Sequence, residues 1–143
     1  MSKSDVFENQ LLRLIFNGTP IANLADNAAT APLTMLYVAL HTADPGESGN
    51  QSTNEVAYTG YARVGVARTA GGWVVTGNSV RPANSIEFGE MTAGTPGTAT
   101  HASIGTAASG AGTILYRGAL TPSVAFNIGV IPRIRSTSTI TEE

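Results

Sequence analysis

Two histidines are the only side chains of this sequence that ordinarily titrate near neutral pH, so they are the first candidates for acid–base chemistry. His41 ends an apolar run and stands shortly before Asp44, and one interpretation makes it a general base that Asp44 orients. The other makes it a histidine at a strand end that hydrogen-bonds the loop after it. No nucleophile elbow, phosphate loop or H-E-x-x-H pattern surrounds His41 or His101. We therefore favour the second interpretation and predict no catalytic residue.

The polar segment that follows, residues 42–59, is longer than most connections in a compact domain. Its oxygen-bearing side chains include Asp44, Glu47, Asn50 and Glu55, which are of the kind that Ca²⁺ binds. The spacing differs from that of an EF-hand, because Gly46 and Ser48 stand where ligands would be needed. The tripeptide 44–46, Asp-Pro-Gly, is instead typical of a turn. We predict no metal ion and no cofactor, and we assign the four polar residues to contacts with a protein partner.

Arg133 and Arg135 would lie on one face of a strand near the end of the chain. Two arginines on one face suit a partner's carboxylate or backbone. They equally suit a solvated sheet edge that resists unwanted pairing. The sequence leaves both readings open, and we count the two arginines among the predicted partner contacts.

Four aromatic residues could form a platform on which a sugar stacks, namely Tyr58, Tyr61, Trp73 and Tyr116. One face of a sugar ring is apolar and packs against aromatic rings. Core and cross-strand packing explains the same residues more simply. We favour packing and retain the platform as an alternative.

The element that the sequence predicts best is an N-terminal helix over residues 5–17. Ser4 is a candidate N-cap, and Gly18 supplies a stop. The stripe of apolar residues at spacings of three and four is Phe7, Leu11, Leu14 and Ile15. Val6, Leu12 and Phe16 lie off this stripe, so the helix is apolar over most of its circumference and needs burial on more than one side.

The rest of the chain alternates strand-like runs with glycine and proline turns. The predicted strands are residues 33–41, 61–68, 73–76, 85–88, 98–104, 113–120, 123–128 and 132–140, with a hairpin turn at 70–72. Many short strands with turns between them predict a mainly β fold, an antiparallel β-sandwich or jelly roll with one N-terminal α-helix. We expect a single domain over residues 1–143, with the helix at about 5–17 and the sandwich at about 33–141.

The composition excludes several classes of protein. The chain has 143 residues, a net charge of -2 and only 13% charged residues, which disfavours a strongly basic nucleic-acid binder. It has no cysteine and no apolar run near the ~20 residues that a membrane span needs, and we expect no secretory signal. We expect folding in a cytoplasm and no membrane partner. Because charge is scarce, we also expect a homo-oligomer on a protein lattice, with loop 42–59 and the chain ends in contact.

Several segments resemble a family of small proteins from tailed phages and prophages. They are residues 4–12, the run Leu36-Tyr37-Val38-Ala39-Leu40-His41-Thr42-Ala43-Asp44-Pro45-Gly46, residues 55–64, Gly71-Gly72-Trp73 and residues 109–116. The resemblance covers nearly the whole chain. Members are commonly labelled phage tail fibre proteins, and their size is similar to that of the small β-sandwich decoration, or cement, proteins of capsids. The resemblance implies a virion protein and carries no catalytic residue.

From these observations we expect a non-enzymatic structural protein of a phage virion, assembled in the cytoplasm of the bacterial host. The first hypothesis is a capsid decoration protein that stabilises the head by binding the major capsid protein. The alternatives are a tail or tail-fibre component, whose partners are other virion proteins, and a glycan-binding module. An enzyme is the last choice.

Overall fold

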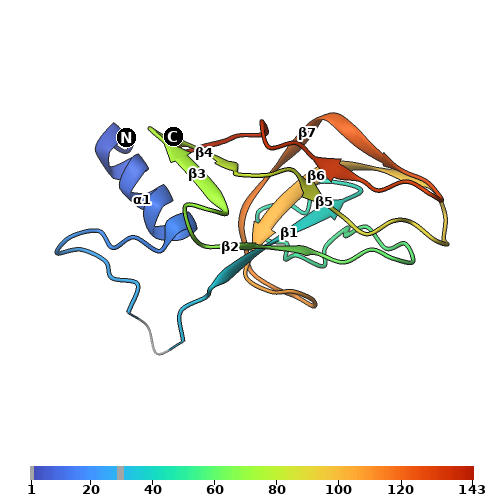
Figure 1. Cartoon of the computed structure of the whole chain (residues 1–143), viewed down its shortest axis with the longest axis horizontal. Coiled ribbons are helices and arrows are strands. Elements are labelled where there is room, and N and C mark those ends of the chain that lie inside the picture. The colour runs from blue at the N-terminus through green and yellow to red at the C-terminus, as the bar shows by residue number, and fades with distance from the viewer. Residues whose placement is uncertain (1, 29–30) are drawn as a thin grey trace. The chain divides into compact units, whose positions relative to one another are not determined.

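The computed structural model describes residues 2–28 and 31–143 and has one helix and nine strands in that part of the chain (Figure 1). The elements in chain order are α1 (Asp5–Asn17), β1 (Met35–His41), β2 (Val64–Ala67), β3 (Trp73–Thr76), β4 (Ser79–Pro82), β5 (Ile86–Glu87), β6 (Gly97–Gly105), β7 (Ile114–Phe126), β8 (Arg133–Ile134) and β9 (Ile140–Thr141). The prediction of a mainly β, antiparallel fold with a single N-terminal helix is confirmed.

The chain divides into two compact units. Unit 1 comprises residues 1–35, 66–85 and 135–143, and unit 2 comprises residues 36–65 and 86–134. The predicted single domain over residues 1–143 stays a prediction. Each unit is described by itself below.

Unit 1 contains α1 and a three-stranded sheet of order β3-β4-β9. The helix begins and ends as predicted, since the Ser4 side chain accepts a hydrogen bond from the Phe7 N–H at 3.4 Å and Gly18 adopts a left-handed conformation (φ 65°). The most deeply buried face of α1 consists of Glu8, Leu12 and Phe16, and the residues of the predicted apolar stripe beside it are half-buried. The helix lies against β3 and β4, and Phe16 packs edge-on against Trp73, with the ring centroids 4.9 Å apart.

The hairpin in unit 1 also differs from the prediction. Strand β3 pairs with β4, and Thr76 faces Ser79, so the turn is Gly77-Asn78. Gly77 has a φ of 59°, as the first position of some two-residue hairpin turns requires. The sequence pattern predicts the hairpin turn at 70–72 instead. That segment does form a turn, in which the Gly72 N–H donates to the Thr69 C=O, but β2 and β3 belong to different sheets.

The main sheet has the order β2-β1-β6-β7. Strands β1 and β6 pair in a register that runs from Tyr37 opposite Gly105 to His41 opposite His101. Strand β7 is one continuous strand through a cis Thr121–Pro122 bond, where the sequence predicted two strands separated near Pro122. The pairing of β7 with β6 shifts register between Ala99 and His101, opposite the part of β7 that contains Pro122. The strand therefore continues past the proline with a local irregularity.

A second, two-stranded sheet in unit 2 joins β5 to β8, with Ile86 opposite Ile134 and Glu87 opposite Arg133. The apolar interior of unit 2 comes from β1, β6, the ends of β5 and β7, and loop 42–59. Its buried residues include Leu36, Val38, Leu40, Val56, Tyr58, Phe88, Met91, Ile104 and Phe126. This interior supports a set of buried polar side chains, which are the candidate site.

Candidate functional site

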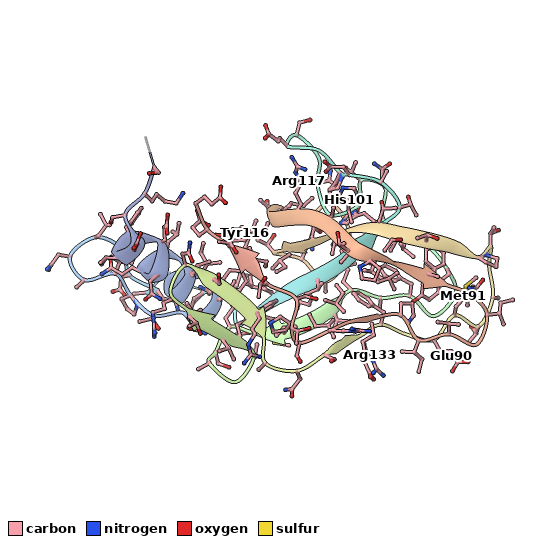
Figure 2. The ribbon with its side chains drawn as sticks, turned by 90° about the horizontal axis from the view of Figure 1, so that it is seen from above. Glu90, Met91, His101, Tyr116, Arg117 and Arg133 are labelled. Atoms are coloured by element: carbon pink, nitrogen blue, oxygen red, sulfur yellow. The ribbon has the colours of Figure 1, made fainter. Side chains whose placement is uncertain are left out.

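Three of the polar residues that the sequence singled out, His41, Asp44 and Glu55, lie in loop 42–59 of unit 2 or at its start. The loop begins where β1 ends, and its first turn is the predicted one: the Gly46 N–H donates to Asp44 Oδ1 at 2.9 Å. Asp44 also pairs with Arg117 of β7, whose Nη1 lies 2.6 Å from Oδ1. Figure 2 shows Arg117 and His101 on neighbouring strands beside this loop. The Gly46 hydrogen bond and the Arg117 guanidinium lower the pKa of the Asp44 carboxyl.

Glu55 forms a bidentate ion pair with Arg63. Arg63 Nε lies 2.7 Å from Glu55 Oε1, and Nη2 lies 2.7 Å from Oε2. The same guanidinium donates to the carbonyl oxygens of Ala107 and Gly110 at 3.0 and 2.7 Å. The hydrogen bonds to Glu55 raise the pKa of Arg63 further. Arg63 therefore ties loop 42–59 to the turn at 107–112, a role that the sequence analysis did not assign to it.

Tyr61 completes this group. Its hydroxyl donates to Glu55 Oε1 at 3.1 Å and accepts a hydrogen bond from the Leu40 N–H at 3.0 Å. Burial raises the pKa of the Tyr61 hydroxyl far above its ordinary value. Both carboxylate oxygens of Glu55 are thus hydrogen-bonded by Arg63 and Tyr61, which makes Glu55 an anchor inside the fold.

His41 and Ser103 form a second buried pair. His41 Nδ1 lies 2.8 Å from the Thr53 carbonyl oxygen, so Nδ1 carries the proton and donates it. His41 Nε2, 2.7 Å from Ser103 Oγ, then accepts from the serine hydroxyl. The arrangement matches that of a serine nucleophile and its base. However, the two residues are only 0% and 1% exposed, so a substrate cannot reach them without opening the loop.

The hydrogen bond to Thr53 is the one that the second interpretation of His41 predicted, since Thr53 belongs to the following loop. Asp44 points instead to Arg117 and does not orient the imidazole. Burial lowers the pKa of His41, which favours the neutral ring. The geometry therefore assigns His41 to holding the loop.

Gln51 is a buried member of the site that sequence reasoning missed. Its Nε2 donates to the Tyr37 carbonyl at 3.1 Å, and its Oε1 accepts from the Ala107 N–H at 3.0 Å. A Cβ added at Gly105 or Gly112 would lie within 2.5 Å of the Gln51 side chain, at 2.3 and 2.2 Å. Gly105 and Gly112 therefore leave room for the Gln51 side chain. Glycines in this region could have indicated a buried neighbour, but nothing in the sequence connects them to Gln51.

The other predicted partner contacts lie at separate places. Glu47 is almost fully exposed and lies 3.9 Å from Arg117 Nη2. The Asn50 side chain accepts a hydrogen bond from the Ser52 N–H at 2.9 Å within the loop. Arg133 pairs with Glu87 across the two-stranded sheet at 2.6 Å, and Arg135 is exposed in unit 1.

The four aromatic residues of the predicted platform belong to both units. Trp73 is buried in unit 1, where it packs on Phe16. Tyr58 is buried in unit 2 and contacts Tyr61 and Phe126, with ring centroids 5.5 and 5.4 Å apart. Tyr116 is half-buried in β7. Packing explains Trp73 and Tyr58, whose rings offer almost no free face, and the platform stays a prediction.

Arg68 is the corresponding anchor of unit 1, and sequence reasoning missed it as well. Its Nε donates to the Ile15 carbonyl at 2.7 Å, and its Nη2 donates to the Leu14 carbonyl at 2.9 Å. Its Nη1 donates to the carbonyl of Leu33 and, at 3.3 Å, to Asn27 Oδ1. A cation at the C-terminal end of α1 interacts favourably with the negative end of the helix dipole. Arg68 supplies this cation, since the helix carries no basic residue of its own in its last turn.

The two chain ends meet within unit 1. The Lys3 ammonium lies 2.9 Å from Glu142 Oε1 and also bonds to the carbonyl oxygen of Glu143. Asn78 exchanges hydrogen bonds with the backbone of Glu142. The ends are therefore tied to each other and to the β3–β4 hairpin, and their role as contact elements stays a prediction.

A search of residues 2–28 and 31–143 finds no group of three or more His, Asp or Glu side chains placed to hold a metal ion. The described helix is too short and too polar to cross a membrane.

Comparison with known proteins provides the family. Residues 2–141 match the family model described as podophage GP4 fiber I protein gp80. No curated protein matches the chain. The matched segment covers nearly the whole sequence and agrees with the resemblance to phage tail fibre proteins. The chain belongs to the podophage GP4 fiber I protein gp80 family, a family of fibre-type proteins of the phage virion.

Proposed function

We propose that this protein is a non-enzymatic structural subunit of a phage fibre, assembled in the host cytoplasm and bound in the virion to other virion proteins. The observation that carries the proposal is the family match over residues 2–141, because the family's description names a fibre protein. This ranks the tail-fibre alternative above capsid decoration, which the sequence analysis preferred.

The geometry of unit 2 supports a structural role. A catalytic base and nucleophile must reach a substrate, yet the His41–Ser103 pair is buried and both imidazole nitrogens are occupied. The Glu55 carboxylate is likewise occupied by Arg63 and Tyr61. Each of these groups joins loop 42–59 to a strand or to another loop, so their hydrogen bonds serve to hold a shape.

The experiment that tests this proposal measures copy number and position in purified virions. If the protein is a fibre subunit, quantitative mass spectrometry should find far fewer copies of it per virion than of the major capsid protein. Gold-labelled antibody should bind at the tail. Virions that lack the protein should adsorb poorly to the host while their heads resist heat and osmotic shock as before. A copy number near that of the capsid protein, with labelled heads, would favour decoration instead.

The non-enzymatic part of the proposal has its own test. Ser103→Ala removes the hydroxyl while keeping a small buried residue in β6. Phages that carry Ser103→Ala should adsorb to the host in proportion to the amount of this protein assembled in their virions. A variant that assembles in full amount but loses adsorption would argue that the serine performs chemistry.

A further inference from the structure

The turn between β7 and β8 brings three large apolar side chains to the surface of unit 2. Ile128, Val130 and Ile131 are 65%, 38% and 49% exposed. Single exposed apolar residues are common, but three within four residues concentrate apolar surface at one turn, and concentrated apolar surface marks contact sites. We call these three residues the apolar tip.

The backbone of the apolar tip is fixed by hydrogen bonds to the segment after β5. The Gly129 N–H donates to the Met91 carbonyl at 2.9 Å, and the Met91 N–H donates to the Val130 carbonyl at 3.0 Å. The Phe88 N–H donates to the Pro132 carbonyl at 2.9 Å just beyond the tip. Met91 and Phe88 are themselves buried. The tip is therefore preorganised, which lowers the entropy cost of a contact made there.

Charges of both signs stand beside the apolar tip. Arg133 is half-exposed and pairs with Glu87, whereas Glu90 is exposed and makes no ion pair seen in the described residues. Figure 2 shows Glu90 and Met91 together at one end of unit 2, with Arg133 farther from that end. A surface with an apolar centre and both an acidic and a basic residue at its rim can pair with a second copy of itself. Across a twofold axis the acidic residue of each copy can face the basic residue of the other.

We propose that the apolar tip is a contact surface between two copies of this chain, with Glu90 of one copy facing Arg133 of the other. The contact buries Ile128, Val130 and Ile131 of both copies. It adds a specific surface to the expected homo-oligomer, at a place different from loop 42–59 and the chain ends. It does not depend on whether the protein sits in a fibre or on a head.

The first experiment is sedimentation velocity of the full chain over a range of concentrations. Ile128→Ser should raise the dissociation constant of the dimer by about tenfold to a hundredfold, since a twofold contact loses the side chain twice. Val6→Ser is the matched control, because Val6 is 69% exposed on α1 of unit 1 and should leave dimerisation unchanged. Circular dichroism of each variant checks that the fold is retained.

The second experiment exchanges the charges at the rim. Glu90→Arg and Arg133→Glu should each weaken the dimer, because like charges then face each other across the axis. An equimolar mixture of the two variants should form a heterodimer that restores the original affinity. This pattern depends on the partner being a second copy of this chain.

Three outcomes would overturn the proposal. The chain could be monomeric at every concentration tested, or its dimer could survive Ile128→Ser and both charge reversals. The third is a monomeric chain that binds another purified virion protein and loses that binding in Ile128→Ser, which would assign the tip to a different partner.

Discussion

Arg63 in unit 2 and Arg68 in unit 1 are close in sequence and both join segments that are far apart in sequence, but they use different chemistry. Arg63 binds both oxygens of the Glu55 carboxylate and two backbone carbonyls. The acceptors seen for Arg68 are three backbone carbonyls and the side-chain oxygen of Asn27, with no carboxylate. One cation is neutralised by an anion, and the other is solvated by dipoles.

The difference determines what each arginine leaves behind when it is removed. Without Arg63, the Glu55 carboxylate remains in a mostly enclosed site with only Tyr61 beside it. Without Arg68, the groups left over are neutral carbonyls at a helix end, and water can bind such groups where they are accessible. We therefore expect unit 2 to be more sensitive than unit 1 to the loss of its arginine.

The largest expected effect is that of Arg63→Met, which keeps an unbranched side chain but removes the cation. It should lower the free energy of unfolding by about 3–5 kcal/mol, the usual cost of breaking a buried ion pair by removing one partner. Urea denaturation followed by circular dichroism measures it. Adding Glu55→Gln to the same chain should recover part of the loss, because the unpaired charge disappears. A loss below about 1 kcal/mol would place the ion pair among ordinary surface pairs.

The next effect tests whether unit 1 is stabilised mainly by apolar packing. Leu12→Ala should cost about 3 kcal/mol, since Leu12 is fully buried on the face of α1 that also carries Phe16. Leu11→Ala is the matched control on the same helix and should cost about 1 kcal/mol or less, because Leu11 is only half-buried. Trp73 fluorescence reports unfolding in this unit. Equal costs at the two positions would contradict the observed orientation of the helix.

Arg68→Met should cost less, about 1–3 kcal/mol, because the carbonyls it leaves are neutral. Arg68→Lys keeps the charge but loses the planar fork that reaches Leu14 and Ile15 together, so it should recover only part of the stability. The measurement is the shift of the urea midpoint at constant slope. A cost for Arg68→Met above that for Arg63→Met would reverse the comparison between the units.

Helix α1 was predicted to the residue, because its boundaries depend on local groups: Ser4 caps one end and Gly18 ends the other. Its most deeply buried face, which carries Leu12 and Phe16, could not be predicted, because a helix that is apolar over most of its circumference is oriented by the surface it meets. Strand β3 was placed correctly but given the wrong partner, since Gly71-Gly72 and Gly77-Asn78 are both turn signals and their choice depends on the rest of the sheet.

The same distinction separates the parts of the site. The hydrogen bond between His41 and the following loop could be predicted, because it joins neighbouring segments. Ser103, Gln51 and the partners of Arg63 could not, because they depend on the register of β1 and β6 and on the path of the turn at 107–112. Long-range pairings of this kind leave no periodic signal in a single sequence.

The smallest expected effect is a pH dependence confined to unit 2. Burial lowers the pKa of His41 in the folded chain below its ordinary 6.5, while His101 and Arg63 oppose its protonation and Glu55 favours it. As pH falls through 6.5, the unfolded chain binds a proton at this position before the folded chain does, so the stability of unit 2 should decrease below that pH and be fully present above it. The protection factor of the Val56 amide, whose N–H bonds to the Leu40 carbonyl, should fall on acidification when each exchange rate is divided into the intrinsic rate at the same pH. His41→Gln should flatten this dependence whatever its effect on absolute stability, whereas Ser103→Ala, which leaves the imidazole in place, should keep it. An unchanged slope in His41→Gln would show that another group carries the response. An equal loss of protection at amides of β3 in unit 1 would show that the response is not confined to the unit that holds the histidine.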